Sequence, residues 1–221
     1  MTTDKPFNQE AQTQDPDLAD TESSIWLFGY GSLIWKPELP FIQTKPARVD
    51  GYVRRFWQGS EDHRGTPEAP GRVVTLVPEP QDHCYGVAYL VSNLDIEQTF
   101  TQLDHREKNG YTRLSLSLSL SLSLKLESET ASATQKTVAG ITYIASENNE
   151  AYRGPAPIKQ IAKEIFQSIG PSGTNIEYLL ELAEALRVRA IDDPHIFALE
   201  TEVLALLKQS TLQASTLQAS S

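Results

Sequence analysis

The chain has 221 residues, a formal net charge of -10 and a hydrophobic fraction of 39%. This length suits one domain with or without tails, and the hydrophobic content is enough for a packed core, which excludes a fully disordered chain. The acidic balance argues against a nucleic-acid-binding surface, because such a surface needs clustered lysine and arginine. The acidic net charge is still compatible with a local basic pocket that binds a small acidic molecule.

Cys84 is the only cysteine, so an internal disulfide is impossible and a reducing cytoplasm is the expected location. The N-terminal residues are polar and acidic, unlike a signal peptide. The sequence contains no run of ~18 apolar residues, so we expect no membrane span. The 4 histidines have no ligand spacing, and we expect no metal site.

Residues 1–24 are rich in Thr, Asp, Gln and Glu and predict a disordered N-terminal tail. Order is expected to begin at 25–28, a buried strand that runs into a turn at Gly29. The prolines Pro78 and Pro80 are expected to close a later strand. The further strands, indicated by β-branched and aromatic residues, are 48–53, 72–77, 84–91 and 138–145.

From 114 to 126, leucine occupies every even position and serine occupies most odd ones. Perfect alternation predicts a strand with all leucines on one face. The register of such a strand is weakly specified, because every two-residue slip places the same residue types opposite the partner. We interpret the segment as an expanded barrel or edge strand without a functional role.

Helices are expected mainly in the second half of the chain. Asp95 and Gln98 have capping-box spacing and predict a helix over 95–107. Asp193 is expected to cap the last helix, and the repeat of 210–214 at 215–219 is expected to be disordered. The other helices, predicted by apolar residues at helical spacing, are 158–169, 175–187 and 194–207.

Strands come first and helices are added, so we predict an α+β fold with a curved or closed sheet. The expected boundaries divide the chain into three parts. These are an N-terminal tail over 1–24, one domain over 25–208 and a low-complexity C-terminal tail over 209–221.

Two glycines flank a tyrosine in the segment from Phe28 to Leu33, directly after the first predicted strand. Glycine lets the backbone approach a ligand, and the exposed N–H groups would suit a carboxylate. The pattern is also typical of a plain tight turn, and taken alone it favours the turn.

Glu107 lies between two cations at the end of the helix predicted over 95–107. Taken alone, this pattern favours a solvated helix end.

Basic and aromatic residues crowd together over 54–72 in an otherwise acidic chain. They fit an anion-binding surface, because guanidinium groups bind carboxylates through paired hydrogen bonds, and they fit structural ion pairs equally well.

Eight segments, in this order and spacing, together resemble the ChaC-like γ-glutamylcyclotransferase family over about residues 25–207. The segments are Phe-Gly-Tyr-Gly-Ser-Leu-Ile-Trp-Lys at 28–36, Arg-Arg-Phe-Trp-Gln-Gly-Ser at 54–60, Asp-His-Arg-Gly at 62–65, Pro-Gly-Arg-Val-Val-Thr-Leu at 70–76, Gly-Val-Ala-Tyr at 86–89, Arg-Glu-Lys-Asn-Gly-Tyr at 106–111, Tyr-Arg-Gly-Pro-Ala-Pro at 152–157 and Gly-Pro-Ser-Gly-Thr-Asn at 170–175.

The resemblance implies a small mixed β-barrel of about five to seven strands with flanking helices. It implies that glutathione is cyclised at its γ-glutamyl group to 5-oxoproline with release of cysteinylglycine. By motif match, Glu107 is the expected catalytic residue. The expected substrate-binding residues are Leu27, Phe28, Gly29, Tyr30, Gly31, Ser32, Leu33, Arg72 and Tyr178.

The implied reaction is intramolecular and needs no cofactor. The α-amine must lose a proton before it attacks the γ-carbonyl, and Glu107 can take this proton and later return it. We expect partial burial to raise the pKa of Glu107, and we expect Arg106 and Lys108 to point away from it. Backbone N–H groups of the loop over 29–33 are expected to hold the substrate and the oxyanion.

Two alternatives stay open. The chain fits a cyclotransferase for γ-glutamyl amino acids or γ-glutamylamines, and it fits a non-catalytic glutathione-binding regulator. The arginine-rich region over 54–72 favours a ligand with a second carboxylate, as glutathione has. We expect a small-molecule substrate, no nucleic acid, no membrane, and a monomer with a dimer as the alternative.

Overall fold

The computed structural model describes residues 24–107, 110–121 and 135–219. Five strands close into a barrel in the order β1-β3-β2-β4-β5, with β1 parallel to β5 and the other pairs antiparallel. The predicted α+β fold around a small mixed barrel is confirmed. The strands are β1 (Ile25–Gly29), β2 (Gln43–Ser60), β3 (Gly71–Val91), β4 (Tyr111–Ser121) and β5 (Gln135–Ala145).

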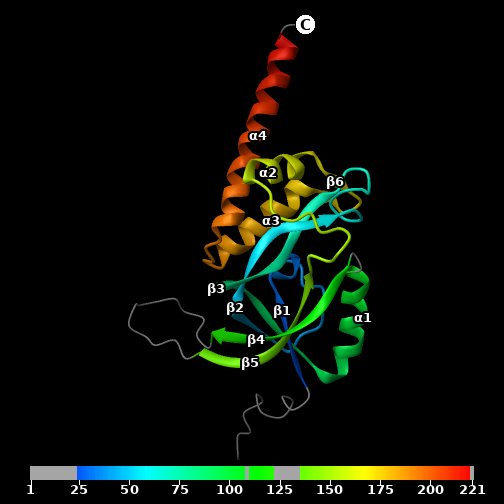
Figure 1. Ribbon diagram of the computed structural model, residues 1–221, viewed down its shortest axis with the longest axis vertical. Coiled ribbons are helices and arrows are strands. Elements are labelled where there is room, and N and C mark those ends of the chain that lie inside the picture. Colours follow the sequence, from blue (N-terminus) through cyan, green and yellow to red (C-terminus); the bar gives the residue numbers. More distant parts are fainter. Residues whose placement is uncertain (1–23, 108–109, 122–134, 220–221) are drawn as a thin grey trace, which may run out of the picture.

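β2 and β3 are longer than the predicted strands and form a paired arm that rises out of the barrel (Figure 1). The two strands predicted within β3 are one strand, so the prediction that Pro78 and Pro80 end it is wrong. The register between β2 and β3 shifts near Gly51 and leaves residues 79–82 of β3 in a bulge. Pro80 lies in this bulge, which tolerates proline because its extra residues need no ladder hydrogen bond, and Pro78, opposite Tyr52, directly precedes the bulge.

β4 carries the leucine–serine alternation into the barrel wall. Leu118 and Leu120 are buried, whereas Ser115 and Ser117 on the opposite face are exposed. β4 pairs with β5 along its whole length. The predicted strand and its inward leucine face are confirmed within β4, and residues 122–126 of the alternation lie outside the described residues.

The helices cover two places on the sheet. α1 lies along one side of the barrel, and three further helices gather over the far end of the β2–β3 arm (Figure 1). Their buried apolar faces, with Ile161, Leu182 and Leu199 fully enclosed, form a second part of the core. The helices are α1 (Ile96–Arg106), α2 (Ile158–Gln167), α3 (Asn175–Val188) and α4 (Pro194–Ala219). The short elements are η2 (Ser32–Ile34), η3 (Asn93–Asp95), β6 (Ile169–Gly170) and β7 (Gly173–Thr174).

The predicted helices are confirmed with shifted ends. The side chain of Asp95 makes no capping bond, so the predicted capping box is wrong, and Ser92 caps the preceding turn instead. Asp193 caps α4 by accepting a hydrogen bond from the Ile196 N–H at 3.2 Å. α4 continues through the repeated pentapeptide to Ala219, where a disordered tail was expected.

The tail predicted over 1–24 lies outside the described residues except for Ser24. Among the helices of the described ranges, none combines the length and the apolar character that a membrane span requires. The domain boundaries at 25 and 208 stay a prediction.

Candidate active site

Two glycines and one short helical turn build the loop that follows β1. A Cβ at Gly29 would lie 2.6 Å from the Cβ of Leu33, so the chain can fold back this tightly only with glycine. Gly31 then precedes η2, whose start has no side-chain cap. Since the first N–H groups of a helical turn have no acceptor within the turn, they can serve a ligand.

The side chains near this loop anchor it to the core. The Tyr30 hydroxyl donates to the carbonyl of Tyr143 at 2.8 Å, so this side chain points into the barrel. Burial, helped by the negative charge of Glu107, raises the pKa of Tyr30 and keeps its hydroxyl protonated. Three further side chains around the loop are buried: Leu27, Phe28 and Leu33.

Glu107 stands at the C-terminal end of α1, where its N–H donates to the carbonyl of Leu103 at 2.7 Å. Its side chain is only 19% exposed. The carboxylate lines a pocket of ≈ 240 Å³ between the loop after β1, the end of α1 and the loop joining β2 to β3. The other lining residues are Ser32, Trp35, Lys36, Glu38, Gly59, Ser60, Asp62, His63, Arg64, Val73, Arg106, Tyr111, Ser172 and Tyr178.

The pocket brings together Glu107 with two of the predicted binding residues, Ser32 and Tyr178. Gly31 borders it, since a Cβ at Gly31 would lie 3.2 Å from the Tyr178 hydroxyl. The remaining predicted residues of β1 and of the loop after it do not line the pocket: Leu27, Phe28, Gly29, Tyr30 and Leu33.

Two opposing influences act on the Glu107 carboxylate. Burial raises its pKa above the ordinary value of a glutamate. Arg106 lowers it, because the Arg106 Nε lies 3.7 Å from a carboxylate oxygen of Glu107. The expectation that Arg106 points away is therefore wrong, and Lys108 lies outside the described residues. Arg106 also donates to Ser32 Oγ at 2.6 Å, so it joins the end of α1 to the loop after β1.

Two tyrosines form the pocket wall next to β3. The Tyr111 hydroxyl donates to the carbonyl of Val74 at 2.8 Å, and the Tyr178 ring packs edge-on against Trp35 at 5.4 Å. Burial raises the pKa of both hydroxyls, so they stay neutral. Glu107 therefore faces a wall that carries hydroxyl groups but no charge.

Sequence reasoning missed Tyr111, His63 and Arg64 as pocket residues. Each lies in a segment that carries the family resemblance, and His63 and Arg64 also belong to the basic cluster over 54–72 that fitted an anion-binding surface. His63 Nδ1 lies 3.0 Å from Ser172 Oγ. Arg64 is held by Glu177 at 2.8 Å. These contacts place two basic side chains along the pocket.

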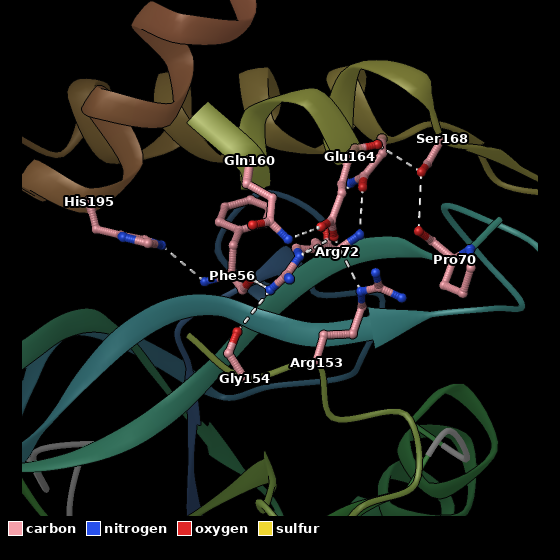
Figure 2. A network of polar contacts seen from close by, with 10 residues as sticks. Phe56, Pro70, Arg72, Arg153, Gly154, Gln160, Glu164, Ser168 and His195 are labelled. Carbon is pink, nitrogen blue, oxygen red and sulfur yellow. Dashed lines mark hydrogen bonds and ion pairs between the residues drawn. The ribbon is translucent and has the colours of Figure 1, made fainter. Parts of the chain in front are cut away.

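The structure does not bring Arg72 into this pocket. Arg72 is 2% exposed and donates to the Glu164 carboxylate at 2.6 Å. It also donates to the carbonyls of Phe56 at 3.1 Å and Gly154 at 2.9 Å. Figure 2 shows Arg72 beneath α2, with these partners around it. The side chain joins α2 to the β2–β3 arm, while its neighbour Val73 lines the pocket.

Within the described ranges, no group of three or more His, Cys, Asp and Glu side chains is placed to hold a metal ion. Burial raises the pKa of the free Cys84 thiol to about 11, so it is protonated at neutral pH. Glu107 in the same pocket as Ser32 of the loop after β1 suits general acid–base chemistry on a bound ligand.

Comparisons with known proteins agree on one family. A family model described as ChaC-like protein matches residues 25–206. Glutathione-specific γ-glutamylcyclotransferase 1 of Danio rerio is 40% identical over 202 residues, which are 90% of this chain and 98% of the relative. γ-Glutamylcyclotransferase 2-3 of Arabidopsis thaliana is 41% identical over 192 residues, which are 85% of this chain and 92% of the relative. A solved structure of a γ-glutamyl cyclotransferase specific to glutathione from yeast has a TM-score of 0.75 and 33% identity, covering 83% of this chain and 96% of that chain.

Proposed function

The chain belongs to the ChaC-like protein family, and we propose that it is a glutathione-specific γ-glutamylcyclotransferase in which Glu107 is the general acid–base. It converts glutathione into 5-oxoproline and cysteinylglycine. The observation that carries the catalytic assignment is the largely enclosed Glu107 carboxylate beside the loop over 29–33. Purified protein incubated with glutathione should release the two products in equal amounts, and an absence of 5-oxoproline would contradict the proposal.

The reaction moves two protons from the attacking nitrogen to the leaving nitrogen. The α-ammonium gives one proton to the Glu107 carboxylate, and the free amine attacks the γ-carbonyl carbon to close a five-membered ring. Protonated Glu107 then protonates the cysteine nitrogen as its bond to the γ-carbon breaks. The second proton follows the same route from the ring nitrogen, so Glu107 ends as a carboxylate and no water is consumed.

The loop after β1 supplies position and charge stabilisation. Backbone N–H groups at Gly31 and Ser32 hold the α-carboxylate or the oxyanion, and well-placed donors of this kind act strongly in an enclosed site. Ser32 Oγ accepts from Arg106, so its own hydroxyl proton is directed elsewhere and can reach the substrate. Since effective molarities of well-oriented ring closures reach ~10⁵–10⁸ M, holding the chain folded supplies much of the acceleration.

The charges along the pocket support a substrate with a second carboxylate. Lys36, His63 and Arg64 line the pocket, and Arg64 also lies over the Tyr178 ring at 5.7 Å. Glutathione carries its second carboxylate on the glycine residue, whereas γ-glutamylamines have none. We therefore expect a higher kcat/KM for glutathione than for a γ-glutamylamine such as γ-glutamylethylamine, and an equal or lower value would favour a cyclotransferase of γ-glutamylamines. γ-Glu-Ala keeps a second carboxylate, and a higher kcat/KM for γ-Glu-Ala than for glutathione would favour a cyclotransferase of γ-glutamyl amino acids.

A non-catalytic glutathione-binding regulator is the second candidate. A regulator has no use for an enclosed carboxylate whose pKa is raised, so Glu107 favours the enzyme. Calorimetry that detects glutathione binding without 5-oxoproline formation would favour the regulator. A cytoplasmic location and a monomeric state, with a dimer as the alternative, complete the proposal, and gel filtration tests the second of these.

A further inference from the structure

The loop after β1 lies between two hollows of the molecule. One is the pocket that holds Glu107, and the other is an open groove of ≈ 1920 Å³ between the barrel, α3 and the start of α4. Among the described residues, Trp35 is the one that lines both. Arg54 lines the groove and not the pocket, so it approaches the loop from the side away from Glu107.

Arg54 is fully engaged in hydrogen bonds at this place. It is 2% exposed, and its Nε donates to the Tyr30 carbonyl at 2.6 Å. Its Nη2 donates to the Tyr85 carbonyl at 2.5 Å, and its Nη1 pairs with Asp193 at 2.6 Å. Because the guanidinium is planar and each nitrogen has its own acceptor, the group cannot turn without losing several bonds.

The bond to Tyr30 fixes the peptide unit that joins Tyr30 to Gly31. This peptide is trans, and the C=O and N–H groups of a trans peptide point in opposite directions within one plane. Since the Tyr30 carbonyl points toward Arg54 on the groove side, the Gly31 N–H points away from the groove. Gly31 lies against Tyr178, which lines the pocket with Glu107.

We propose that Arg54 is a positioning residue for the cyclisation: it holds the Tyr30–Gly31 peptide so that the Gly31 N–H donates to the γ-carbonyl oxygen as negative charge develops there. This inference rests on the proposed function. Gly31 has no side chain to restrict rotation of the peptide, so its orientation needs an anchor from outside the loop. In the flipped orientation the Tyr30 carbonyl would face the oxyanion and repel it.

Stability alone gives a weak reason for a guanidinium at this position. Burial of a charge costs free energy, and well-packed apolar residues often replace buried ion pairs without loss of stability. An apolar residue could not hold the Tyr30 carbonyl, and this is what distinguishes Arg54 from such a replacement.

Two variants separate the anchor from the ion pair. Asp193→Asn removes the carboxylate charge, keeps an N-cap for α4 and leaves the Arg54 bond to Tyr30 in place, so we expect kcat to stay within a few-fold of wild type. The double variant Arg54→Met with Asp193→Asn removes the anchor without leaving an unpaired buried charge. We expect its kcat to fall by ~10²–10³ with little change in KM, as for loss of one oxyanion donor.

Thermal melts of both variants verify folding. The inference is overturned if the folded double variant keeps the wild-type kcat, or if Asp193→Asn alone loses as much. A wild-type protein that forms no 5-oxoproline would instead contradict the proposed function. Failure of the Arg54 inference and failure of the proposed function are therefore distinguishable.

A second measurement needs only the wild-type protein. The chain contains two Tyr-Gly pairs, at 30–31 and 85–86. In protein labelled with ¹³C-carbonyl tyrosine and ¹⁵N-glycine, an amide spectrum filtered for ¹³C–¹⁵N bonds therefore shows two peaks, those of Gly31 and Gly86. Both tyrosine carbonyls accept from Arg54, but Gly86 is held opposite Ala47 in the sheet and serves as the control. Titration to saturation with 5-oxoproline should move the Gly31 peak and leave the Gly86 peak in place. An unmoved Gly31 peak would contradict the inference, whatever the variants show.

Discussion

At the scale of single residues, Glu107 is tuned by opposing effects. Burial raises its pKa, which makes the carboxylate a stronger base, while the charges of Arg106 and His63 lower its pKa and oppose this rise. A general base works best when its pKa lies near the working pH. The enclosed position at the end of α1 and the neighbouring guanidinium together set this balance.

We expect kcat/KM to fall at acid pH, because protonated Glu107 cannot accept the proton of the α-ammonium. Since burial raises the pKa of Glu107, the midpoint of this fall should lie above ~4.3, the value of a free glutamate. Arg106→Gln removes a charge that lowers the pKa, so it should move the midpoint to higher pH. Rate profiles of both proteins measure this, and a midpoint at or below ~4.3, or a shift to lower pH in the variant, would argue against it.

At the scale of elements, β4 shows what a repetitive sequence can and cannot specify. The leucine–serine alternation determines which face points inward, but it is unchanged by a two-residue slip. β5 specifies the register of β4, because the absence of a side chain at Gly140 leaves the space that the Leu118 side chain fills. The inward face could be predicted from the segment alone, whereas the register depends on a partner strand elsewhere in the chain.

Leu118→Ala should therefore destabilise the protein more than Leu114→Ala, although both leucines lie on the same face of β4. Leu118 is 0% exposed, and truncation of a fully buried leucine costs ~2–5 kcal/mol. Leu114 is only partly buried and should cost less. Urea unfolding of the two variants compares them, and equal losses would show that Leu118 has no special place in the register.

At the scale of the whole molecule, buried arginines join the barrel to the helices over the β2–β3 arm. Arg72 reaches Glu164 of α2, and Arg54 reaches Asp193 at the start of α4. These contacts set the position of β3 and of the loop after β1 relative to the helices. The pocket therefore depends on residues that do not line it.

Arg72→Ala should lower stability without raising the KM for glutathione. Loss of one partner from a buried pair costs ~3–5 kcal/mol, because the other charge is left without compensation. Arg153→Ala is the matched control, since Arg153 contacts the same Glu164 carboxylate at 3.2 Å but is 35% exposed and should cost little. A folded Arg72→Ala protein with wild-type stability and a raised KM would instead support the role in substrate binding that the sequence suggested.

The fold was largely predictable because its signals are local. Apolar periodicity located the helices, strand composition located four of the barrel strands, even where two predicted strands proved to be one, and the leucine–serine alternation located β4. Tyr111, Arg54 and the true partners of Arg72 were not predictable from the residues alone. Arg54 and Asp193, for example, are 139 positions apart, and the packing of α4 against β2 brings them together. The bulge near Pro80 also depends on the partner strand.

The most direct test of the account is the rate of 5-oxoproline release by Glu107→Gln with glutathione as substrate. The substitution keeps the size of the side chain and removes the base, so we expect the rate to fall by ~10²–10⁴. Glu38→Gln is the control, because Glu38 lines the same pocket but its side chain is 58% exposed, and it should stay within a few-fold of wild type. A Glu107→Gln protein that releases 5-oxoproline at the wild-type rate would contradict the assignment of Glu107 as the acid–base.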